Sequence, residues 1–252
     1  MTIDLSGIPA LLNYDAAVDW SERLEREGPF LLRALAGAPS RRVLDLGSAT
    51  GEHARWLAAD GFSVVGIEGV RERWEVAKRL APPGVEHLAG DLGAVEAMVR
   101  GQFGAAICLG STLPCLIGAE AISRMLIGLR RRFLDGGVFV AQLVNFAGLE
   151  TRRVTELPVH RVQRAEDELL FRSELGYDTD GVVTVAESLT RRTRDGKEES
   201  VHLRHRYLQG WRPDELRTLL DLARFRSVEI SGGFAGEPFD AELSDEMVIV
   251  AS

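Results

Sequence analysis

The chain has few cysteines, no long apolar run and a shortage of positive charge. Its two cysteines, Cys108 and Cys115, are too few for a disulfide framework or a four-ligand zinc site, which favours a reducing compartment. No stretch reaches the roughly 18 consecutive apolar residues of a membrane-spanning helix. Residues 1–4 include no basic segment followed by an apolar one, as a secretory signal would. We therefore expect a cytoplasmic protein without a membrane partner.

The balance of charge argues against another group of partners. The 252 residues include 30 Lys and Arg against 38 Asp and Glu, which gives a net charge of −8. An acidic chain binds phosphate backbones poorly, so we expect no nucleic-acid partner. A content of 45% hydrophobic and 27% charged residues is typical of a folded protein. At about 150 residues per domain, the length fits one large domain or one domain with an insertion.

The central part of the chain alternates short apolar segments with amphipathic ones. The apolar segments are rich in Val, Ile and Leu without polar alternation, which is typical of strands buried on both faces by helices. Such alternation predicts a doubly wound α/β core with a mostly parallel sheet. The expected strands cover residues 42–47, 63–68, 85–91, 103–110 and 138–145, and the expected helices cover residues 51–60, 70–81, 93–100 and 118–133.

Both flanks of this core have their own pattern. Residues 15–36 are expected to be helical with a break at Gly28-Pro29, and Pro213 marks the start of a later helix. Three long segments separated by turn signals predict an antiparallel region, and two final strands bring the main sheet to seven. These five strands are expected at residues 168–177, 182–194, 200–208, 227–231 and 246–251. The predicted division is a helical cap at 1–40, a core at 41–151 and 209–252, and an inserted antiparallel β region at 152–208.

One turn in the core carries the most chemical information. Residues 43–52 read Val-Leu-Asp-Leu-Gly-Ser-Ala-Thr-Gly-Glu, so a buried strand runs into a turn bracketed by Gly47 and Gly51. Such a turn lets a ligand approach the backbone at the carboxyl edge of the sheet. The next two strands end in Glu68 and Asp91, which adds two carboxylates at the same edge. One ligand spanning the three turns is therefore expected, although Asp91 also suits a helix N-cap.

The same turn departs from the dinucleotide-binding fingerprint. Gly-x-Gly-x-x-Gly requires a middle glycine, where this chain has Ala49, and a third glycine that is absent here. A pyrophosphate would be poorly held by such a turn. This departure disfavours a nicotinamide-dependent oxidoreductase, which is one competing interpretation.

These motifs resemble those of class I S-adenosylmethionine-dependent methyltransferases, over nearly the whole chain. The resemblance implies a Rossmann-like methyltransferase fold and S-adenosylmethionine as cofactor. The turn at residues 45–51 resembles the loop under the methionine part, Glu68 resembles the ribose-binding acid, and Asp91 with Leu92 resembles the adenine contact. Leu109 matches a position that flanks the cofactor. The cofactor-binding residues implied in this way are Trp20, Arg23, Asp45, Gly47, Ser48, Gly51, Glu68, Gly69, Asp91, Leu92 and Leu109.

Two further segments resemble a small-molecule subgroup related to glycine and sarcosine N-methyltransferases. Residues 109–114, Leu-Gly-Ser-Thr-Leu-Pro, are similar to its Gly-Asn-Ser-Leu-Pro segment. Residues 142–146, Gln-Leu-Val-Asn-Phe, are similar to its Asn-Tyr-Asp segment. Thr112 and Phe146 depart from the subgroup's pattern. The resemblance therefore implies the cofactor without implying a glycine-like acceptor.

The N-terminal part adds a third resemblance to this subgroup. There a Tyr-Asp pair and a Trp-x-x-Arg helix cap the cofactor, and Tyr14-Asp15 and Trp20 with Arg23 stand at the matching positions here. Two alternatives stay open for this segment. Trp20 is also a candidate core residue, and Arg23 has a potential partner in Glu27 at i,i+4 on a helix.

The acceptor side is less defined by the sequence. The candidate residues near the acceptor are Tyr14, Asn145, His205 and Arg206, although Tyr14 and Asn145 also suit backbone hydrogen bonding. No cluster of His, Cys and Asp has metal-ligand spacing, so we expect no metal. The insert at 152–208 carries as many acidic as basic residues, which argues against a phosphate-reading surface. We expect it to form a lid over the substrate or a homodimer surface.

The function expected from these features is methyl transfer from S-adenosylmethionine to a small-molecule acceptor, with an amine nitrogen favoured. The reaction is an in-line displacement that an enzyme assists mainly by orientation. The alternatives are O-methylation of a small metabolite, methylation of nucleic acid or protein, and a non-catalytic cofactor-binding protein. Base-modifying methyltransferases usually carry Asn/Asp-Pro-Pro-Phe/Tyr where this chain has residues 109–112, which argues against a nucleic-acid substrate.

Overall fold

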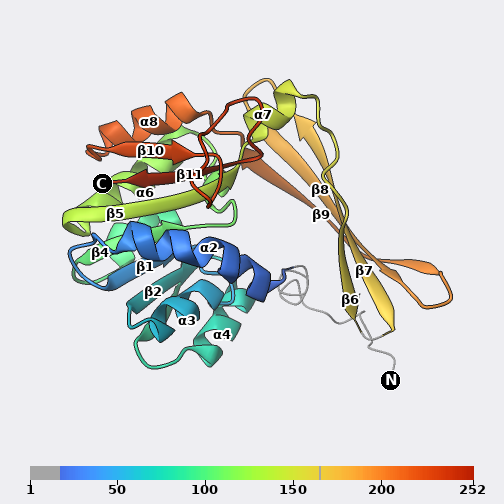
Figure 1. The fold of residues 1–252 in the computed structure, drawn as a ribbon, viewed down its shortest axis with the longest axis horizontal. Helices are drawn as coiled ribbons and strands as arrows, with labels where there is room; N and C mark the ends of the chain where they lie inside the picture. Colours follow the sequence, from blue (N-terminus) through green and yellow to red (C-terminus); the bar gives the residue numbers. More distant parts are fainter. Residues whose placement is uncertain (1–17, 165) are drawn as a thin grey trace.

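The computed structural model describes residues 18–164 and 166–252, which form two β-sheets (Figure 1). A seven-stranded sheet with helices on both faces makes the larger part. A four-stranded antiparallel sheet stands beside it and extends away from it. Tyr14 and Asp15 lie outside the described residues. No helix within the described ranges is long and apolar enough to cross a membrane.

The larger sheet has the strand order β10-β11-β5-β4-β1-β2-β3. All neighbours pair in parallel except β11, which is antiparallel to both β5 and β10. The predicted doubly wound, mostly parallel seven-stranded fold is therefore confirmed. The strand order reverses beside β1, where an open α/β sheet offers a crevice for ligands. The strands are β1 (Arg42–Leu46), β2 (Ser63–Glu68), β3 (Val85–Ala89), β4 (Phe103–Cys108), β5 (Phe133–Val144), β10 (Val228–Ser231) and β11 (Glu246–Ala251).

Helices bury apolar stripes on both faces of this sheet. α2 and α3 contribute Leu31 and Leu57 to the core on one face, and α6 and α8 contribute Met125 and Leu216 to the core on the other. Each of these side chains is at most 1% exposed, and full burial of such a side chain contributes about 1.5–3 kcal/mol. The α-helices are α2 (Trp20–Leu35), α3 (Glu52–Ala59), α4 (Arg71–Leu80), α5 (Val95–Met98), α6 (Ala119–Arg131), α7 (Phe146–Thr151) and α8 (Pro213–Leu222).

The expected break at Gly28-Pro29 is wrong, because α2 continues through both residues. A proline inside a helix costs about 3 kcal/mol. Burial of Leu31 and Leu35 in the turns that follow offsets a cost of this size. Gly28 serves packing instead: a Cβ atom there would lie 2.5 Å from the ring of Trp56 in α3. The glycine thus lets α2 approach α3 closely.

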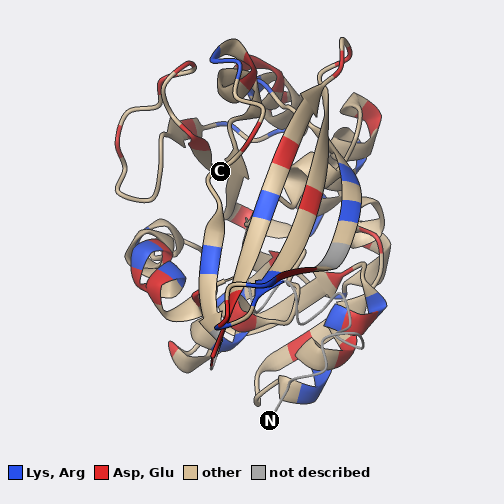
Figure 2. Cartoon of the chain, turned by 90° about the vertical axis from the view of Figure 1, so that its right-hand side faces the viewer, with Lys and Arg blue, Asp and Glu red and all other residues tan. Residues whose placement is uncertain are grey.

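The four-stranded sheet has the order β6-β7-β8-β9 and is antiparallel throughout. Three of its strands were expected, and β6 is an additional edge strand. Figure 2 shows basic and acidic residues interspersed along this sheet. The side chains of each strand alternate between a face toward the larger sheet and an outer face. The strands are β6 (His160–Arg164), β7 (Asp167–Tyr177), β8 (Val182–Arg192) and β9 (Glu198–Gln209).

Some boundaries differ from the sequence expectations. β5 begins at Phe133 and not at Val138, because the register with β4 shifts and a bulge takes up the intervening residues. The helix expected at 93–100 is a single 3₁₀ turn, η2 (Leu92–Ala94), followed by the short α5. The short helix α7 was not expected, and Asn145 caps it by accepting from the Gly148 N–H at 3.1 Å.

Candidate functional site

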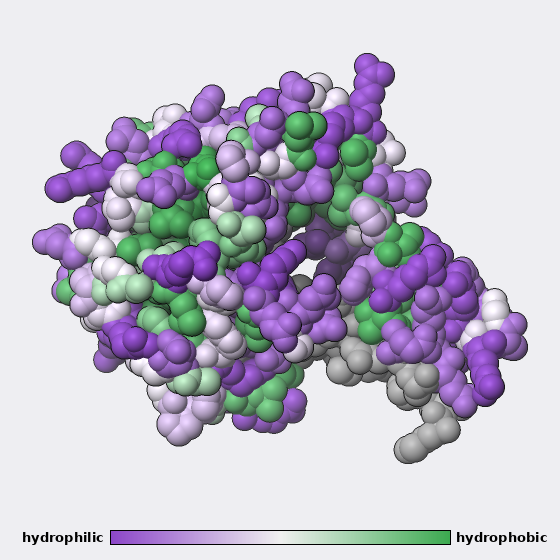
Figure 3. All heavy atoms as spheres, in the orientation of Figure 1, coloured by the Kyte–Doolittle hydropathy of each residue, from purple (hydrophilic) through white to green (hydrophobic). Residues whose placement is uncertain are grey.

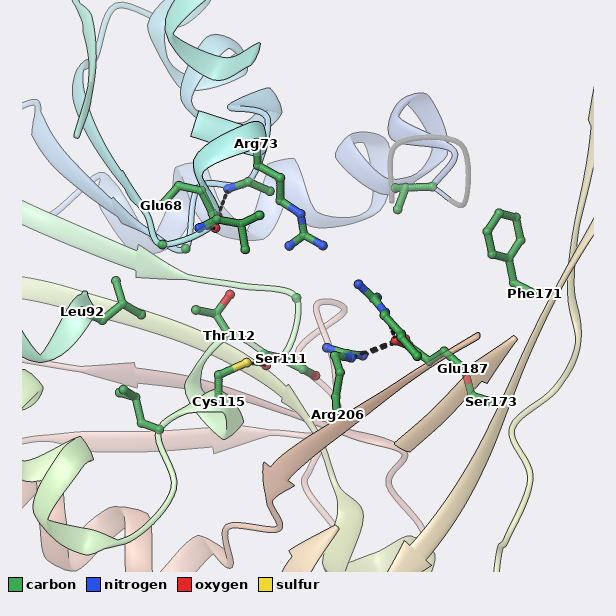
Figure 4. Close-up of a pocket in the computed structure, with 18 of the residues that line it drawn as sticks. Glu68, Arg73, Leu92, Ser111, Thr112, Cys115, Phe171, Ser173, Glu187 and Arg206 are labelled. Atoms are coloured by element: carbon green, nitrogen blue, oxygen red, sulfur yellow. Dashed lines mark hydrogen bonds and ion pairs between the residues drawn. The ribbon is translucent and has the colours of Figure 1, made fainter. Parts of the chain in front are cut away.

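A cavity of about 790 Å³ lies at the carboxyl ends of β1, β2, β3 and β4, with the antiparallel sheet as its opposite wall. Figure 3 shows the surface hollowed between the larger body and this sheet. Figure 4 shows Glu68 and Arg73 on one side of the cavity, and Glu187 and Arg206 on the other. The cavity thus joins the turns of the α/β core to side chains of β7, β8 and β9.

The turn after β1 forms one wall. Gly47 and Gly51 have φ angles of 76° and 85°, and Ala49 between them has a φ of 47°. Glycine adopts these left-handed angles without a steric penalty, whereas Ala49 is held there by its surroundings. A Cβ atom on Gly47 would lie 2.3 Å from Cγ2 of Thr112. Gly47 is therefore required both for its angle and for the close approach of the Thr112 loop.

The backbone amides of this turn are already engaged. The N–H groups of Gly47 and Ser48 donate to the carbonyl of Ile67 at 2.8 and 3.0 Å. The Ala49 N–H donates to Glu68 Oε2 at 2.8 Å, and the Gly51 N–H donates to the carbonyl of Ser48 at 2.8 Å. A pyrophosphate site depends on free N–H groups at such a turn. These four donors are therefore not free to bind phosphate.

Glu68 closes the end of β2 and lines the cavity. Its carboxylate is bound at both oxygens, since Oε2 accepts from the Ala49 N–H and Oε1 accepts from the Val70 N–H at 2.7 Å. The residue is only 6% exposed, so these two amides fix its orientation. Each carboxylate oxygen has a second lone pair. Glu68 can therefore accept from two hydroxyl groups of a ligand without giving up its own contacts.

Asp91 follows β3 and is exposed at the rim of the cavity. Its Oδ1 accepts from the Gly93 N–H at 2.6 Å, which makes it the N-cap of the 3₁₀ turn η2, as one alternative anticipated. Leu92 lies beside it in the cavity wall. A carboxylate and an apolar side chain at this point suit a ligand with a polar edge and a flat apolar face.

The loop after β4 supplies the floor. Gly110 donates its N–H to Gln142 Oε1 at 2.9 Å, and Gln142 donates to Glu246 Oε2 at 2.7 Å. Ser111 has a φ of 58°, and its hydroxyl accepts from the Val144 N–H at 3.0 Å. The Thr112 hydroxyl donates to the carbonyl of Leu109 at 2.8 Å. The loop is therefore fixed to β5 and β11 before any ligand binds.

The opposite wall holds a compact charged group. Glu187 of β8 accepts at Oε2 from Nε of Arg204 and, at 2.9 Å, from Nε of Arg206. Its Oε1 accepts from Nη2 of Arg206 at 2.8 Å. Burial alone would raise the pKa of Glu187, but the hydrogen bonds and charges of both arginines outweigh it and lower that pKa. Glu187 is therefore ionised at neutral pH.

Two buried ionisable groups lie behind the turn. Asp45 is 3% exposed, and its Oδ2 has no hydrogen-bond partner among the described residues. Burial raises the pKa of Asp45 to about 6, and the charge of Glu68 adds to this effect against the opposing charges of His53 and Arg23. Burial also lowers the pKa of His87 to about 4, so its ring is neutral at pH 7. Neither side chain lines the cavity.

The first residues of α2 form a network of their own. Arg23 donates to Glu27 Oε1 at 2.8 Å, and its guanidinium lies 5.1 Å from the ring centre of Trp20. The other oxygen of Glu27 pairs with Nε2 of His53 at 2.8 Å. Burial alone would raise the pKa of Glu27, but these partners lower it. The pairing of Arg23 with Glu27 that the helical spacing allows is thus formed.

The structure separates the implied cofactor residues into two groups. Asp45, Ser48, Gly51, Leu109, Trp20 and Arg23 support the wall from behind or lie beside it and do not line the cavity. Those that line it are Gly47, Glu68, Gly69, Asp91 and Leu92.

The acceptor-side candidates are also divided. Arg206 lines the cavity. His205 does not, because neighbouring residues of a strand point to opposite faces, and it is exposed on the outer face of β9. Asn145 is 0% exposed, and its amide donates to the carbonyls of Ala241 and Ser244 at 3.0 and 2.9 Å. Its role is therefore to bind backbone groups. Tyr14 lies outside the described residues.

Several cavity residues were not singled out from the sequence. Arg204 shares its face with Arg206 by strand alternation, a signal that the sequence contains. Glu187 is placed by the register of β8 against β9, which local patterns do not give. Arg73 and His160 also line the cavity. Within the described ranges, no group of three His, Cys, Asp or Glu side chains has the arrangement of a metal site.

Known proteins resemble this chain both in sequence and in three-dimensional structure. No protein-family model matches the chain. Over 102 residues the chain is 34% identical to the glycine/sarcosine N-methyltransferase of Parasynechococcus marenigrum (strain WH8102), a match that covers 39% of this chain and 36% of that protein. The chain thus spans about a third of the length of this relative.

Two solved structures share the fold over nearly the full length. The CcbJ methyltransferase from Streptomyces caelestis is 23% identical with a TM-score of 0.75, covering 98% of this chain and 97% of that one. CalS10, an amino pentose methyltransferase from Micromonospora echinaspora solved with S-adenosylmethionine bound, is 17% identical with a TM-score of 0.72, covering 95% and 94%.

The fold is therefore that of S-adenosylmethionine-dependent methyltransferases. Within this class, the sequence is similar to glycine/sarcosine N-methyltransferases.

Proposed function

We propose that the protein is an S-adenosylmethionine-dependent methyltransferase that methylates an amine nitrogen of a small-molecule acceptor. The observation that carries this proposal is the convergence of Gly47, Glu68 and Asp91 on one cavity, from the ends of three neighbouring parallel strands. This cavity is wide enough for a nucleoside-sized ligand and a second molecule.

The residues present fit this cofactor. The two oxygens of Glu68 would accept from the ribose hydroxyls, Asp91 and Leu92 would hold the adenine edge and face, and Gly47 gives the methionine part access to the turn. The engaged amides of the turn favour a ligand without a pyrophosphate there, which supports S-adenosylmethionine over a nicotinamide dinucleotide. The resemblance of the motifs to methyltransferases agrees with this choice.

In methyl transfer, the main contribution of the protein is to orient the two reactants. When bound, the cofactor supplies a methyl group that is already activated by a sulfonium. Holding a nucleophile in line with the bond that breaks lowers the activation barrier. In well-oriented reactions this lowering is of the order of 7–11 kcal/mol. The fixed loop at Gly110 and Ser111 provides a rigid surface on which an acceptor can be oriented. Phe171 and Leu189 add apolar surface that excludes water.

An amine acceptor is favoured by the names of the relatives. Three of the matched curated proteins are glycine/sarcosine N-methyltransferases, and CalS10 is named an amino pentose methyltransferase. All of these names describe methylation of, or a substrate with, an amino group. The antiparallel sheet stands opposite the turns of the core and limits the width of the cavity, which favours a small molecule over a polymer.

Two measurements test the proposal. Thermal unfolding is recorded with saturating S-adenosylhomocysteine and, in parallel, with NAD, since a ligand at 100 times its Kd stabilises by about 2.7 kcal/mol. The protein is then incubated with S-adenosylmethionine and a panel of small amines, alcohols and acids, and S-adenosylhomocysteine is quantified by mass spectrometry. We expect S-adenosylhomocysteine to stabilise the protein and NAD not to do so. In the turnover assay, we expect S-adenosylhomocysteine to form only with the amines. Stabilisation by NAD alone, or product only with alcohols, would overturn it.

A further inference from the structure

The charged group on the antiparallel wall faces the cavity at the acceptor side. Arg204 and Arg206 of β9 and Glu187 of β8 all line the cavity, and their side chains are 32%, 37% and 23% exposed. Figure 4 shows Arg206 joined to Glu187 across the cavity from Glu68. The three side chains come from two adjacent strands and lie on the same face of the sheet, toward the cavity.

This group carries more positive than negative charge. Glu187 uses both oxygens on the two arginines, so its charge is compensated by one of the two guanidinium groups. Among the contacts of the described residues, the two terminal nitrogens of Arg204 and Nη1 of Arg206 donate no hydrogen bond. Arg73 extends into the cavity from the opposite wall (Figure 4).

We infer that the acceptor carries an anionic group, a carboxylate or a phosphate ester, that binds to Arg204 and Arg206. This inference rests on the proposed function and names the substrate class of its site. The planar fork of a guanidinium matches carboxylate and phosphate oxygens in a bidentate way. An anion here supplies the second counter-charge that the pair lacks. The amine of the acceptor is then directed away from this wall, toward the cofactor end of the cavity.

Glu187 acts as a positioning residue in this arrangement. Two guanidinium groups on one strand repel each other, and the carboxylate between them holds both at a fixed separation. Glu187 is a poor base for a substrate ammonium, because the same arginines lower its pKa. Its geometry therefore serves anion binding and not proton removal.

The first experiment measures binding without requiring turnover. Thermal unfolding of the protein saturated with S-adenosylhomocysteine is recorded with sodium phosphate or sodium acetate, at constant ionic strength set with sodium chloride. The variants are R204Q/R206Q and, as a control of equal charge, R194Q/K197Q, whose side chains are 81% and 68% exposed at the far turn. We expect one or both anions to stabilise the wild type and the control, and not R204Q/R206Q.

A second variant separates an anion site from a structural ion pair. E187Q keeps one side-chain oxygen that can accept from the arginines, so it retains part of their positioning. It removes the charge of the carboxylate that pairs with them among the described residues, so we expect it to bind the anion at least threefold more tightly than the wild type. If the group were only structural, E187Q would lose stability without any gain in anion binding. Equal stabilisation of the wild type and R204Q/R206Q by both anions, or none in either, would overturn the inference.

The acceptor assay then distinguishes the two sources of anion. Matched pairs of amines are compared, namely β-alanine with β-alanine amide, and phosphoethanolamine with ethanolamine. We expect at least a tenfold higher kcat/KM for the anionic member of one pair, and loss of that preference in R204Q/R206Q with unchanged affinity for S-adenosylhomocysteine. Preference for the neutral members, or a weakened affinity for S-adenosylhomocysteine, would overturn the inference. Stabilisation by S-adenosylhomocysteine itself reports separately on the proposed function.

Discussion

Replacing Glu68 by Gln tests the cofactor end of the cavity most directly. In the protein, Oε2 accepts from the Ala49 N–H and Oε1 accepts from the Val70 N–H. A glutamine has one oxygen in place of two, so its NH₂ group must face one of these donors. Val70 is 39% exposed and Ala49 only 7%, so the NH₂ group is expected to face Val70, where water can replace the lost acceptor.

The expected magnitudes follow from this geometry. Leaving a buried donor unsatisfied costs about 1–3 kcal/mol, and partial solvation of Val70 puts E68Q near the lower end, about 1–2 kcal/mol less stable. A hydrogen bond to a charged group contributes about 1.5–3 kcal/mol, so loss of one of the proposed ribose contacts is expected to weaken S-adenosylhomocysteine binding by roughly 10- to 100-fold.

Urea unfolding of the free protein measures the first quantity, and isothermal titration with S-adenosylhomocysteine measures the second. The control is E75Q, at a residue of α4 whose side chain is 55% exposed and whose ion pair with Arg71 is a surface one. We expect it to change either quantity by less than about 0.5 kcal/mol. An E68Q variant that binds S-adenosylhomocysteine as tightly as the wild type would refute the reasoning.

Three further predictions concern the cavity wall and the core behind it. G28A places a Cβ atom 2.5 Å from an indole ring of α3 and should lose about 1–3 kcal/mol by urea unfolding, whereas G37A, with open space, should not. G47A places a Cβ atom at a φ of 76° and 2.3 Å from Thr112. In isothermal titration it should weaken S-adenosylhomocysteine binding at least tenfold, which is about 1.4 kcal/mol, and unchanged binding contradicts this. Burial raises the pKa of Asp45 from 3.8 to about 6, so the unfolded state ionises first and the wild type loses stability as pH rises through this window. In urea unfolding, the stability of D45N relative to the wild type should therefore rise by roughly 2 kcal/mol from pH 4 to 7, and a flat difference contradicts this.

The sequence predicts best the strands that are formed by one continuous apolar run. β2 and β11 begin and end as expected, because strands buried on both faces are continuous apolar runs. The start of β5 was misplaced because Gly136-Gly137 resembles a turn, although the strand passes through it as a bulge. The edge strand β6 was missed because an exposed strand has no apolar pattern to show.

The candidate site divides in the same way. Glu68 and Asp91 were found because parallel strands end at a common edge, so position along the chain determines position in space. His205 was placed in the cleft because the sequence shows which residues alternate without showing which set faces inward. Its neighbour Arg206 belongs to that inner set. Glu187 depends on the pairing of two strands across a long hairpin, and that register is a tertiary property.

The attachment of the antiparallel sheet has a consequence for how such proteins diverge. The chain enters this sheet after α7 and leaves it before α8, and the apolar cluster of Phe146, Leu149, Leu175, Val185 and Leu208 joins it to the core at that end. Substitutions along its free length alter the cavity wall formed by β7, β8 and β9 and leave the turns at Gly47, Glu68 and Asp91 unchanged. Under the proposed function, the cofactor-binding turns and much of the acceptor surface thus lie in separate segments of the chain. Recombination that exchanges residues 152–209 between homologues is expected to transfer acceptor preference as a unit.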